Sequence, residues 1–482
     1  MKNIYKYLLS ENNNISLFIL LGIIFYTMTY ISVGGFIPNA IPVHHDDYSN
    51  YARILSITDL SLVRPLSTFI IQVLSNIHPE VLIYGIRILT VSYVFLIFYL
   101  ISEIFEIRIN FIYKLIICIA IFSTPISIEY SRYTGMITHL ISGNLAFLAI
   151  ILLSRSLKVS KIYLLILSSV FMFLSVISKE DFILFYLVTI FYMIFIDNSE
   201  KIIDWKIRLI ILIGIVFIFS AIIFSKTAVS SSFLGTTDSS STYYLNVLPS
   251  SIIDTIVKYL SGAKHPSLEI HGQFVILIFL FSLFFNIFYL REKNINGFFI
   301  ILFSILIILP YSVLPNHINA YYELLWLPFI YISFFISLGK FLKDISFNKF
   351  LYIVTVLITF LIFLALLIVD YQPRKSIANW YDTISLSNKN NIKMLIDNKD
   401  IINKEKKVCI LGADSFSPWF MHNGSYLENV IGIDATWMIV IDSNSQFYKG
   451  FYLSEEMSSK KLNKIIIVDV CPPDIISIDL RD

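Results

Sequence analysis

The sequence predicts an α-helical protein that crosses a membrane many times. Of its 482 residues, 57% are hydrophobic and only 15% are charged, whereas soluble globular proteins carry roughly 25% charged residues. Apolar runs of about 20 residues recur along most of the chain, and a helix of that length crosses a hydrocarbon core of roughly 30 Å. We therefore expect a polytopic membrane protein with about 11 transmembrane helices and a small C-terminal α/β domain.

The predicted spans lie near residues 15–35, 80–102, 112–128, 134–154, 162–178, 181–196, 208–225, 272–290, 297–314, 322–339 and 349–370. A cleaved signal peptide is the alternative for the first span, but its apolar region would be only about 7–15 residues long, so we interpret it as an uncleaved helix. The spans on either side of Lys179-Glu180 would together exceed 50 Å as one helix, so we predict that the chain reverses there.

Basic residues are concentrated in the loops on one side of these spans, which predicts a cytoplasmic N-terminus and an outer C-terminus. Two outer loops are long, the first at residues 36–79 and the fourth at 226–271. In the first, segments 48–60 and 66–77 have the apolar spacing of interfacial helices, and in the fourth, segment 251–260 is amphipathic. We assign residues 1–370 to the transmembrane domain and residues 371–482 to an outer domain.

The outer domain is predicted to contain buried strands at residues 407–411 and 464–470, with a helical pattern between them. Cys409 and Cys471 lie at these strands. Neighbouring strands would allow a disulfide between them, and otherwise the two thiols stay free.

Two histidines and two aspartates, His44-His45-Asp46-Asp47, follow the first span and are candidate catalytic residues. The carboxylates can instead solvate the loop or cap the helix expected from residue 48. The four side chains can also ligate a divalent ion, but four consecutive residues rarely converge on one metal. We therefore predict no cofactor.

Further ionisable candidates lie on the same predicted side of the membrane. They are Arg64, Arg132, Lys179, Glu180, His139, His317, Tyr321 and Glu323. A site at this boundary suits a lipid-linked substrate, because cations can stabilise a leaving phosphate while a carboxylate takes a proton from an attacking hydroxyl. A transporter would place such groups near the middle of its spans, where we find almost none.

Four motifs, in this order, resemble the GT-C glycosyltransferases: HHDDY at 44–48, RPLS at 64–67, SKED at 178–181 and LPNHINAYYELLWLP at 314–328. Within that group, the chain is similar to users of polyprenyl-phosphate sugars such as protein O-mannosyltransferases, lipid A aminoarabinose transferases and bacterial O-antigen glucosyltransferases. The resemblance implies inverting transfer of a monosaccharide from a polyprenyl-phosphate carrier to a surface glycan, lipid-linked saccharide or protein. It places this reaction at the outer face of the cytoplasmic membrane, among membrane lipids and without nucleic acid.

The resemblance also implies roles for individual residues. Asp46 would orient or deprotonate the acceptor, with Asp47 beside it. Arg132, Lys179 and Arg64 would bind the donor phosphate. The remaining candidates for substrate contact are His45, Glu180, His139, His317, Tyr321 and Glu323.

The chain departs from the family pattern at one place. Relatives often carry an acid several residues after the arginine that corresponds to Arg132, but residues 133–138 contain none. His139 or Glu129 is the candidate substitute. The alternative functions are a polysaccharide polymerase or ligase, which would usually have arginines in its large outer loop, and a flippase or transporter.

Overall fold

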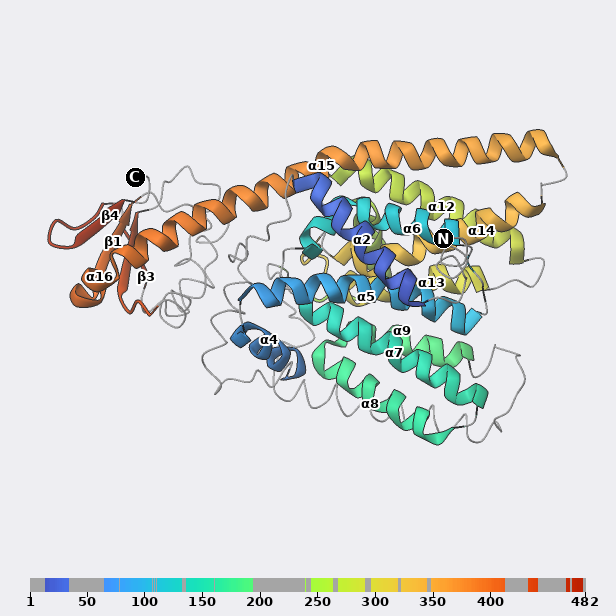
Figure 1. Ribbon diagram of the computed structural model, residues 1–482, viewed down its shortest axis with the longest axis horizontal. Helices are drawn as coiled ribbons and strands as arrows, with labels where there is room; N and C mark the ends of the chain where they lie inside the picture. The colour runs from blue at the N-terminus through green and yellow to red at the C-terminus, as the bar shows by residue number, and fades with distance from the viewer. Residues whose placement is uncertain are drawn as a thin grey trace, which may run out of the picture.

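Apolar helices dominate the computed structural model (Figure 1). It describes residues 14–33, 65–77, 79–105, 107, 109, 111–131, 136–159, 161–193, 239, 244–262, 268–290, 296–319, 322–344, 348–411, 432–440, 465–468 and 470–479. In this part of the chain, five helices are long and apolar enough to cross a membrane, and four shorter ones are also apolar. The helical membrane-protein character is therefore confirmed, while the count of eleven spans and their orientation stay predictions.

The helix bounds follow the predicted spans closely where both can be compared. The α-helices are α2 (Asn14–Val33), α4 (Pro65–Ile77), α5 (Pro79–Phe105), α6 (Phe111–Ser123), α7 (Ile137–Val159), α8 (Ile162–Ser178), α9 (Ile183–Phe191), α11 (Pro249–Leu260), α12 (Glu269–Leu290), α13 (Asn296–Ser312), α14 (Glu323–Asp344), α15 (Lys349–Asp397) and α16 (Lys399–Glu405). Two 3₁₀ helices, η1 (Pro125–Ser131) and η3 (Glu180–Phe182), connect α6 to α7 and α8 to α9.

Two amphipathic segments of the predicted outer loops are helices, α4 and α11. The expected helix at residues 48–60 and the span near 208–225 lie outside the described residues. The predicted break at Lys179 is present, because α8 ends at Ser178 and the backbone of Lys179 is extended.

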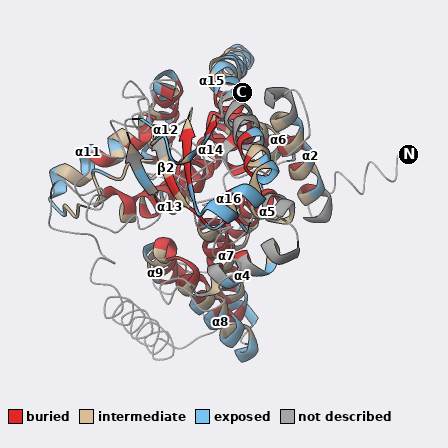
Figure 2. Cartoon of the chain, turned by 90° about the vertical axis from the view of Figure 1, so that its left-hand side faces the viewer, coloured by how far each residue is buried: buried red, intermediate tan, exposed pale blue. Residues whose placement is uncertain are grey.

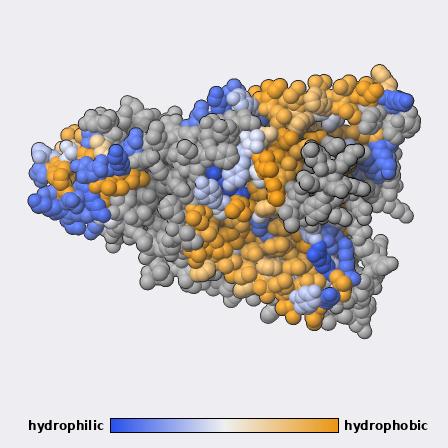
Figure 3. All heavy atoms as spheres, viewed as in Figure 1, coloured by the Kyte–Doolittle hydropathy of each residue, from blue (hydrophilic) through white to orange (hydrophobic). Residues whose placement is uncertain are grey.

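The centre of the bundle is formed by α14, which is buried on all sides from Glu323 to Phe335 (Figure 2). A helix that is apolar all round belongs in the interior of a large core. Large apolar side chains are instead exposed on the outer helices, such as Ile162 on α8 and Phe350 on α15. The bundle surface in Figure 3 is correspondingly hydrophobic, whereas the region of the strands is hydrophilic. This distribution is expected when the solvent of the bundle is lipid.

The longest helix, α15, continues beyond the bundle toward the strands (Figure 1). It has 49 residues, which corresponds to about 70 Å at 1.5 Å per residue, more than a bilayer requires. The predicted domain boundary after residue 370 falls within this helix, which contains Pro373 without ending there.

Four parallel strands form one sheet at the C-terminal end, in the order β3-β2-β1-β4. They are β1 (Lys407–Leu411), β2 (Thr436–Val440), β3 (Ile465–Val468) and β4 (Ile476–Asp479). The strands predicted at 407–411 and 464–470 correspond to β1 and β3, whereas β2 lies where only a helical pattern was expected. Cys409 in β1 forms a disulfide with Cys471, with 5.7 Å between their Cα atoms.

Candidate functional site

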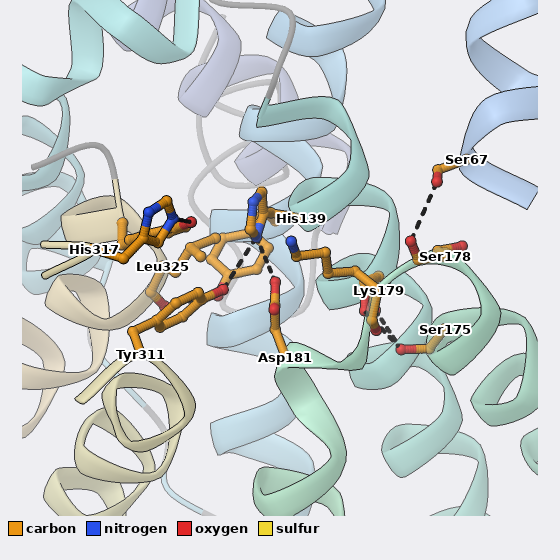
Figure 4. A network of polar contacts seen from close by, with 12 residues as sticks. Ser67, His139, Ser175, Ser178, Lys179, Asp181, Tyr311, His317 and Leu325 are labelled. Carbon is orange, nitrogen blue, oxygen red and sulfur yellow. Dashed lines mark hydrogen bonds and ion pairs between the residues drawn. The ribbon is translucent and has the colours of Figure 1, made fainter. Parts of the chain in front are cut away.

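Residues from three of the four motifs converge at one end of the bundle, where α8 ends and α7 and α14 begin (Figure 4). We call this end of the bundle the site end. Ser67 comes from RPLS, Ser178 to Asp181 from SKED, and His317, Tyr322 and Glu323 from the late motif. The packing of α4, α8 and the start of α14 thus brings together residues that are more than 100 positions apart in the sequence.

The SKED turn is fixed by hydrogen bonds from two other helices. Ser67 Oγ of α4 donates to the carbonyl of Ser178 at 3.2 Å. Ser142 Oγ of α7 donates to the carbonyl of Lys179 at 2.7 Å, and the backbone N–H of Lys179 donates to Ser175 at 3.0 Å. These bonds satisfy carbonyls at the end of α8, which no further helical turn can reach. Lys179 and Asp181 are consequently held in fixed positions.

Asp181 and His139 form a buried carboxylate–imidazole pair. The Nδ1 atom of His139, in the first turn of α7, contacts Asp181 Oδ2, and the hydroxyl of Tyr311 lies 3.1 Å from the same nitrogen. His139 is 5% exposed and Asp181 is 3% exposed. A carboxylate that accepts a hydrogen bond from one ring nitrogen orients the imidazole and makes its other nitrogen a better base.

The electrostatic surroundings favour a charged Asp181 in the η3 turn. Burial alone would raise the pKa of this carboxyl, but His139 and Lys179 outweigh burial and hold the pKa below its ordinary value. Tyr311 adds a hydrogen bond to the same carboxylate. The group therefore combines an anion, an ammonium and an imidazole within one small volume.

A glycine explains why α7 comes close enough to η3 for this pairing. A Cβ atom at Gly143 would lie 2.4 Å from Tyr93 Cε2 and 2.8 Å from Phe182 Cζ, so only glycine fits between these rings. Tyr93 is itself fixed, since its hydroxyl donates to the carbonyl of Leu325 at 2.7 Å. Gly143 lies one helical turn after His139, and Phe182 directly follows Asp181.

Aromatic side chains form one wall of the group. The rings of Tyr311 and Tyr322 stack with centroids 3.9 Å apart, and Tyr322 meets the His139 ring edge-on at 5.2 Å. His317 Nε2 lies 3.1 Å from the Tyr322 hydroxyl. The hydroxyl of Tyr259, on α11, donates to the His317 carbonyl at 3.1 Å. The late motif thus contributes His317 and Tyr322 from the α13–α14 connection, and Tyr311 comes from the end of α13.

Two buried arginines bind the last carbonyls of η1 and of α6, the two segments that precede Arg132. Arg87 Nε donates to the carbonyl of Ser131 at 3.0 Å, and Arg374 Nη1 donates to the carbonyl of Ser123 at 3.2 Å. These carbonyls belong to the last residues of η1 and α6, where no later N–H group of the same helix is available to bind them. Both cations therefore stabilise the path of the chain toward Arg132.

The structure brings together His139, Lys179 and His317 from the predicted site. Glu180 is half-buried in the same turn. Glu323 is at the site end, but its carboxylate binds His271. The other candidates, Asp46, Asp47, His45, Arg64, Arg132 and Tyr321, lie outside the described residues, and of Glu129 only the backbone is described.

The sequence marks Asp181 only as the last residue of the SKED motif and does not single out Tyr311. The closeness of Asp181 to Lys179 in the sequence was a usable signal that Asp181 belongs to the site. No signal marked Tyr311, because the chain contains 29 tyrosines.

Within the described residues, no group of three His, Cys, Asp or Glu side chains is arranged to hold a metal ion. The histidines and aspartates of residues 44–47 are not among them. In comparisons with known proteins, the chain matches no protein-family model and no curated protein.

Proposed function

We propose that the chain is a membrane glycosyltransferase of GT-C type. It transfers a monosaccharide, with inversion, from a polyprenyl-phosphate carrier to a surface glycan, a lipid-linked saccharide or a protein. One observation carries the proposal: an apolar helical bundle buries a carboxylate–imidazole pair beside a lysine, at the end where separate motifs converge. A base and a cation are the two groups that direct displacement on a glycosyl phosphate needs.

In the proposed reaction, a base accepts the proton of the acceptor hydroxyl as its oxygen bonds to the anomeric carbon. The bond from that carbon to the phosphate oxygen breaks, and the polyprenyl phosphate leaves with the bonding electrons. Lys179 and Arg132 stabilise the charge on the leaving phosphate. Positioned base catalysis contributes about 10²–10⁴-fold.

Asp46 is the base that the resemblance implies, and the pair of Asp181 and His139 supplies the second acidic group. The acid that relatives carry after their arginine is missing behind Arg132, but His139, seven residues after Arg132, contacts Asp181. A carboxylate from the SKED turn thus compensates for the departure from the family pattern. Tyr322 and Tyr311 provide flat, amphipathic faces beside this pair.

The disulfide supports an outer location for the C-terminal domain. Disulfides persist in oxidising compartments and are rare in the cytosol, and Cys409 and Cys471 are joined. If the sheet is outside, α15 leaves the membrane at the outer face. The site end, which α15 passes at Asp370, then faces outward too.

One observation favours a transporter as the second candidate. His271, Glu323 and Asp370 are ionisable side chains buried between apolar helices, and such groups often belong to proton or ion pathways. His271 and Glu323 lie in the first turns of α12 and α14 rather than at mid-helix, which is why we place transfer first.

The experiment uses the purified full-length protein in lipid vesicles with a panel of undecaprenyl-phosphate-linked monosaccharides and a cell-envelope extract as acceptor. We expect time-dependent transfer of the sugar and release of undecaprenyl phosphate. Movement of the intact lipid-linked sugar between leaflets, without cleavage of the sugar–phosphate bond, would instead identify a flippase.

A further inference from the structure

His271 bridges two carboxylates in the interior of the bundle. Its Nδ1 atom lies 2.7 Å from Asp370 Oδ1, and its Nε2 atom lies 2.6 Å from Glu323 Oε1. The three residues come from α12, α15 and α14. His271 and Asp370 are fully buried and Glu323 is 4% exposed. We call these three residues the buried triad.

The triad must carry one proton more than a neutral imidazole and two ionised carboxylates would have. A neutral imidazole has one N–H, so its other nitrogen would face a carboxylate oxygen lone pair to lone pair. The short distances on both sides therefore require an imidazolium or a protonated carboxyl. In either form, at least one bond of the triad is charge-assisted, which makes it stronger than a neutral hydrogen bond.

A further cation lies close to the triad. Arg374 follows Asp370 by one turn of α15 and is 4% exposed. Its charge interacts through space with the Asp370 carboxylate, while its Nη1 atom donates to the Ser123 carbonyl. The triad is consequently a fixed polar link between three helices that are otherwise apolar at this level.

The triad is attached to the candidate site through the start of α14. Glu323 is the first residue of α14 and directly follows Tyr322, whose ring stacks on Tyr311 and meets His139. The first four N–H groups of a helix have no partner within it, so a helix start is held by its side chains. In α14, Glu323 ties this start to α12 through its bond to His271, and the Tyr93 hydroxyl donates to the Leu325 carbonyl in the same turn.

We propose that His271 and Asp370 are positioning residues for the candidate site. Held between α12 and α15, they fix Glu323, and Glu323 fixes Tyr322 beside the pair of His139 and Asp181. The effect on turnover rests on the proposed function. The effect on the start of α14 does not.

The first test is hydrogen exchange of the purified protein in lipid nanodiscs, read at the first hydrogen-bonded turn of α14. Asp370→Asn keeps an oxygen that can accept from His271 but removes the charge, and His271→Asn can reach only one carboxylate. Loss of a bond to a charged group makes local opening about 10- to 100-fold more frequent. We expect exchange in that turn to accelerate by this factor in both variants.

Ser282→Ala is the matched control. It removes a hydrogen bond of 3.0 Å between α12 and α14, from Ser282 to Ser333, farther along the same helices. Exchange at the start of α14 should stay at the wild-type rate. Unchanged exchange there in both triad variants would overturn the proposal. Acceleration throughout α7 and α8 would also overturn it, since the triad would then stabilise the bundle as a whole.

The second test is sugar transfer by the same proteins. Displacement of Tyr322 should lower kcat at least tenfold in both triad variants and leave the pH dependence of kcat unchanged, because neither residue exchanges a proton with substrate. A shifted pH profile would contradict a positioning role and assign the triad to proton transfer. If the wild-type protein transfers no sugar, the proposed function fails, while hydrogen exchange still decides the positioning role.

Discussion

Replacement of Gly143 by alanine tests whether close packing of α7 on η3 creates the candidate site. The added Cβ would lie 2.4 Å from Tyr93 Cε2 and 2.8 Å from Phe182 Cζ, where ordinary contact begins at 3.4 Å. One of the rings or α7 must therefore move by about 1 Å. Tyr93 cannot yield freely, because its hydroxyl is bonded to Leu325. We therefore expect α7 to move away from Tyr93 and to take His139 away from Asp181.

The energetic effect has two parts of opposite sign. Overpacking of a dense core costs about 1–3 kcal/mol, whereas alanine in place of glycine in a helix gains up to about 1 kcal/mol. The net expectation is a loss of about 0–3 kcal/mol in the free energy of unfolding. The effect on turnover should be larger, since a misplacement of 1 Å can cost about 10²-fold in rate.

The assay combines thermal unfolding of Gly143→Ala in detergent with its sugar-transfer rate in vesicles. Gly22→Ala is the matched control, because Gly22 lies in another apolar helix, α2, and a Cβ atom there would meet nothing within 4 Å. We expect Gly22→Ala to be as stable and active as the wild type, or slightly more stable. Wild-type turnover in Gly143→Ala would refute the reasoning that links this contact to the site.

Two further predictions concern buried hydroxyls and the location of the sheet. Tyr93→Phe should lower the free energy of unfolding by about 1 kcal/mol, while Tyr331→Phe should leave it unchanged or raise it, because the buried Tyr331 hydroxyl has no hydrogen-bond partner among the described residues. Equal losses in both variants, measured by thermal unfolding, would contradict this assignment. In intact cells, a membrane-impermeant maleimide should label Cys409 and Cys471 only after treatment with an impermeant reductant. Labelling that requires permeabilised cells would place the sheet in the cytoplasm.

The helices were largely predictable from the sequence because length and hydropathy are local properties. The break at Lys179 followed from arithmetic alone, since a longer helix would not fit a bilayer. The continuation of α15 past residue 370 was not predictable from hydropathy. Where a helix leaves the membrane its residues become polar, and hydropathy reads this change as the end of the helix. Strand β2 was missed because a short apolar run has no periodicity that separates strand from helix.

The grouping of several site residues was predictable from the sequence, but their contacts were not. Sequence order and sidedness brought Lys179, His139 and His317 into one hypothesis. The pairing of His139 with Asp181 depends on the space that Gly143 leaves, which no spacing rule encodes. The buried triad was missed for the same reason, since His271 and Asp370 lie 99 residues apart and each stands alone at the edge of a predicted span.

The central claim is that the pair of Asp181 and His139 acts on a polyprenyl-phosphate sugar at the site end. Its most direct test is the rate of undecaprenyl-phosphate release from the labelled donor by Asp181→Asn in vesicles. Asp254→Asn is the matched control, because this exposed carboxylate on α11 pairs only locally with Lys258. We predict a rate at least 10²-fold below the wild type for Asp181→Asn and an unchanged rate for Asp254→Asn. Wild-type release by folded Asp181→Asn protein would contradict the account.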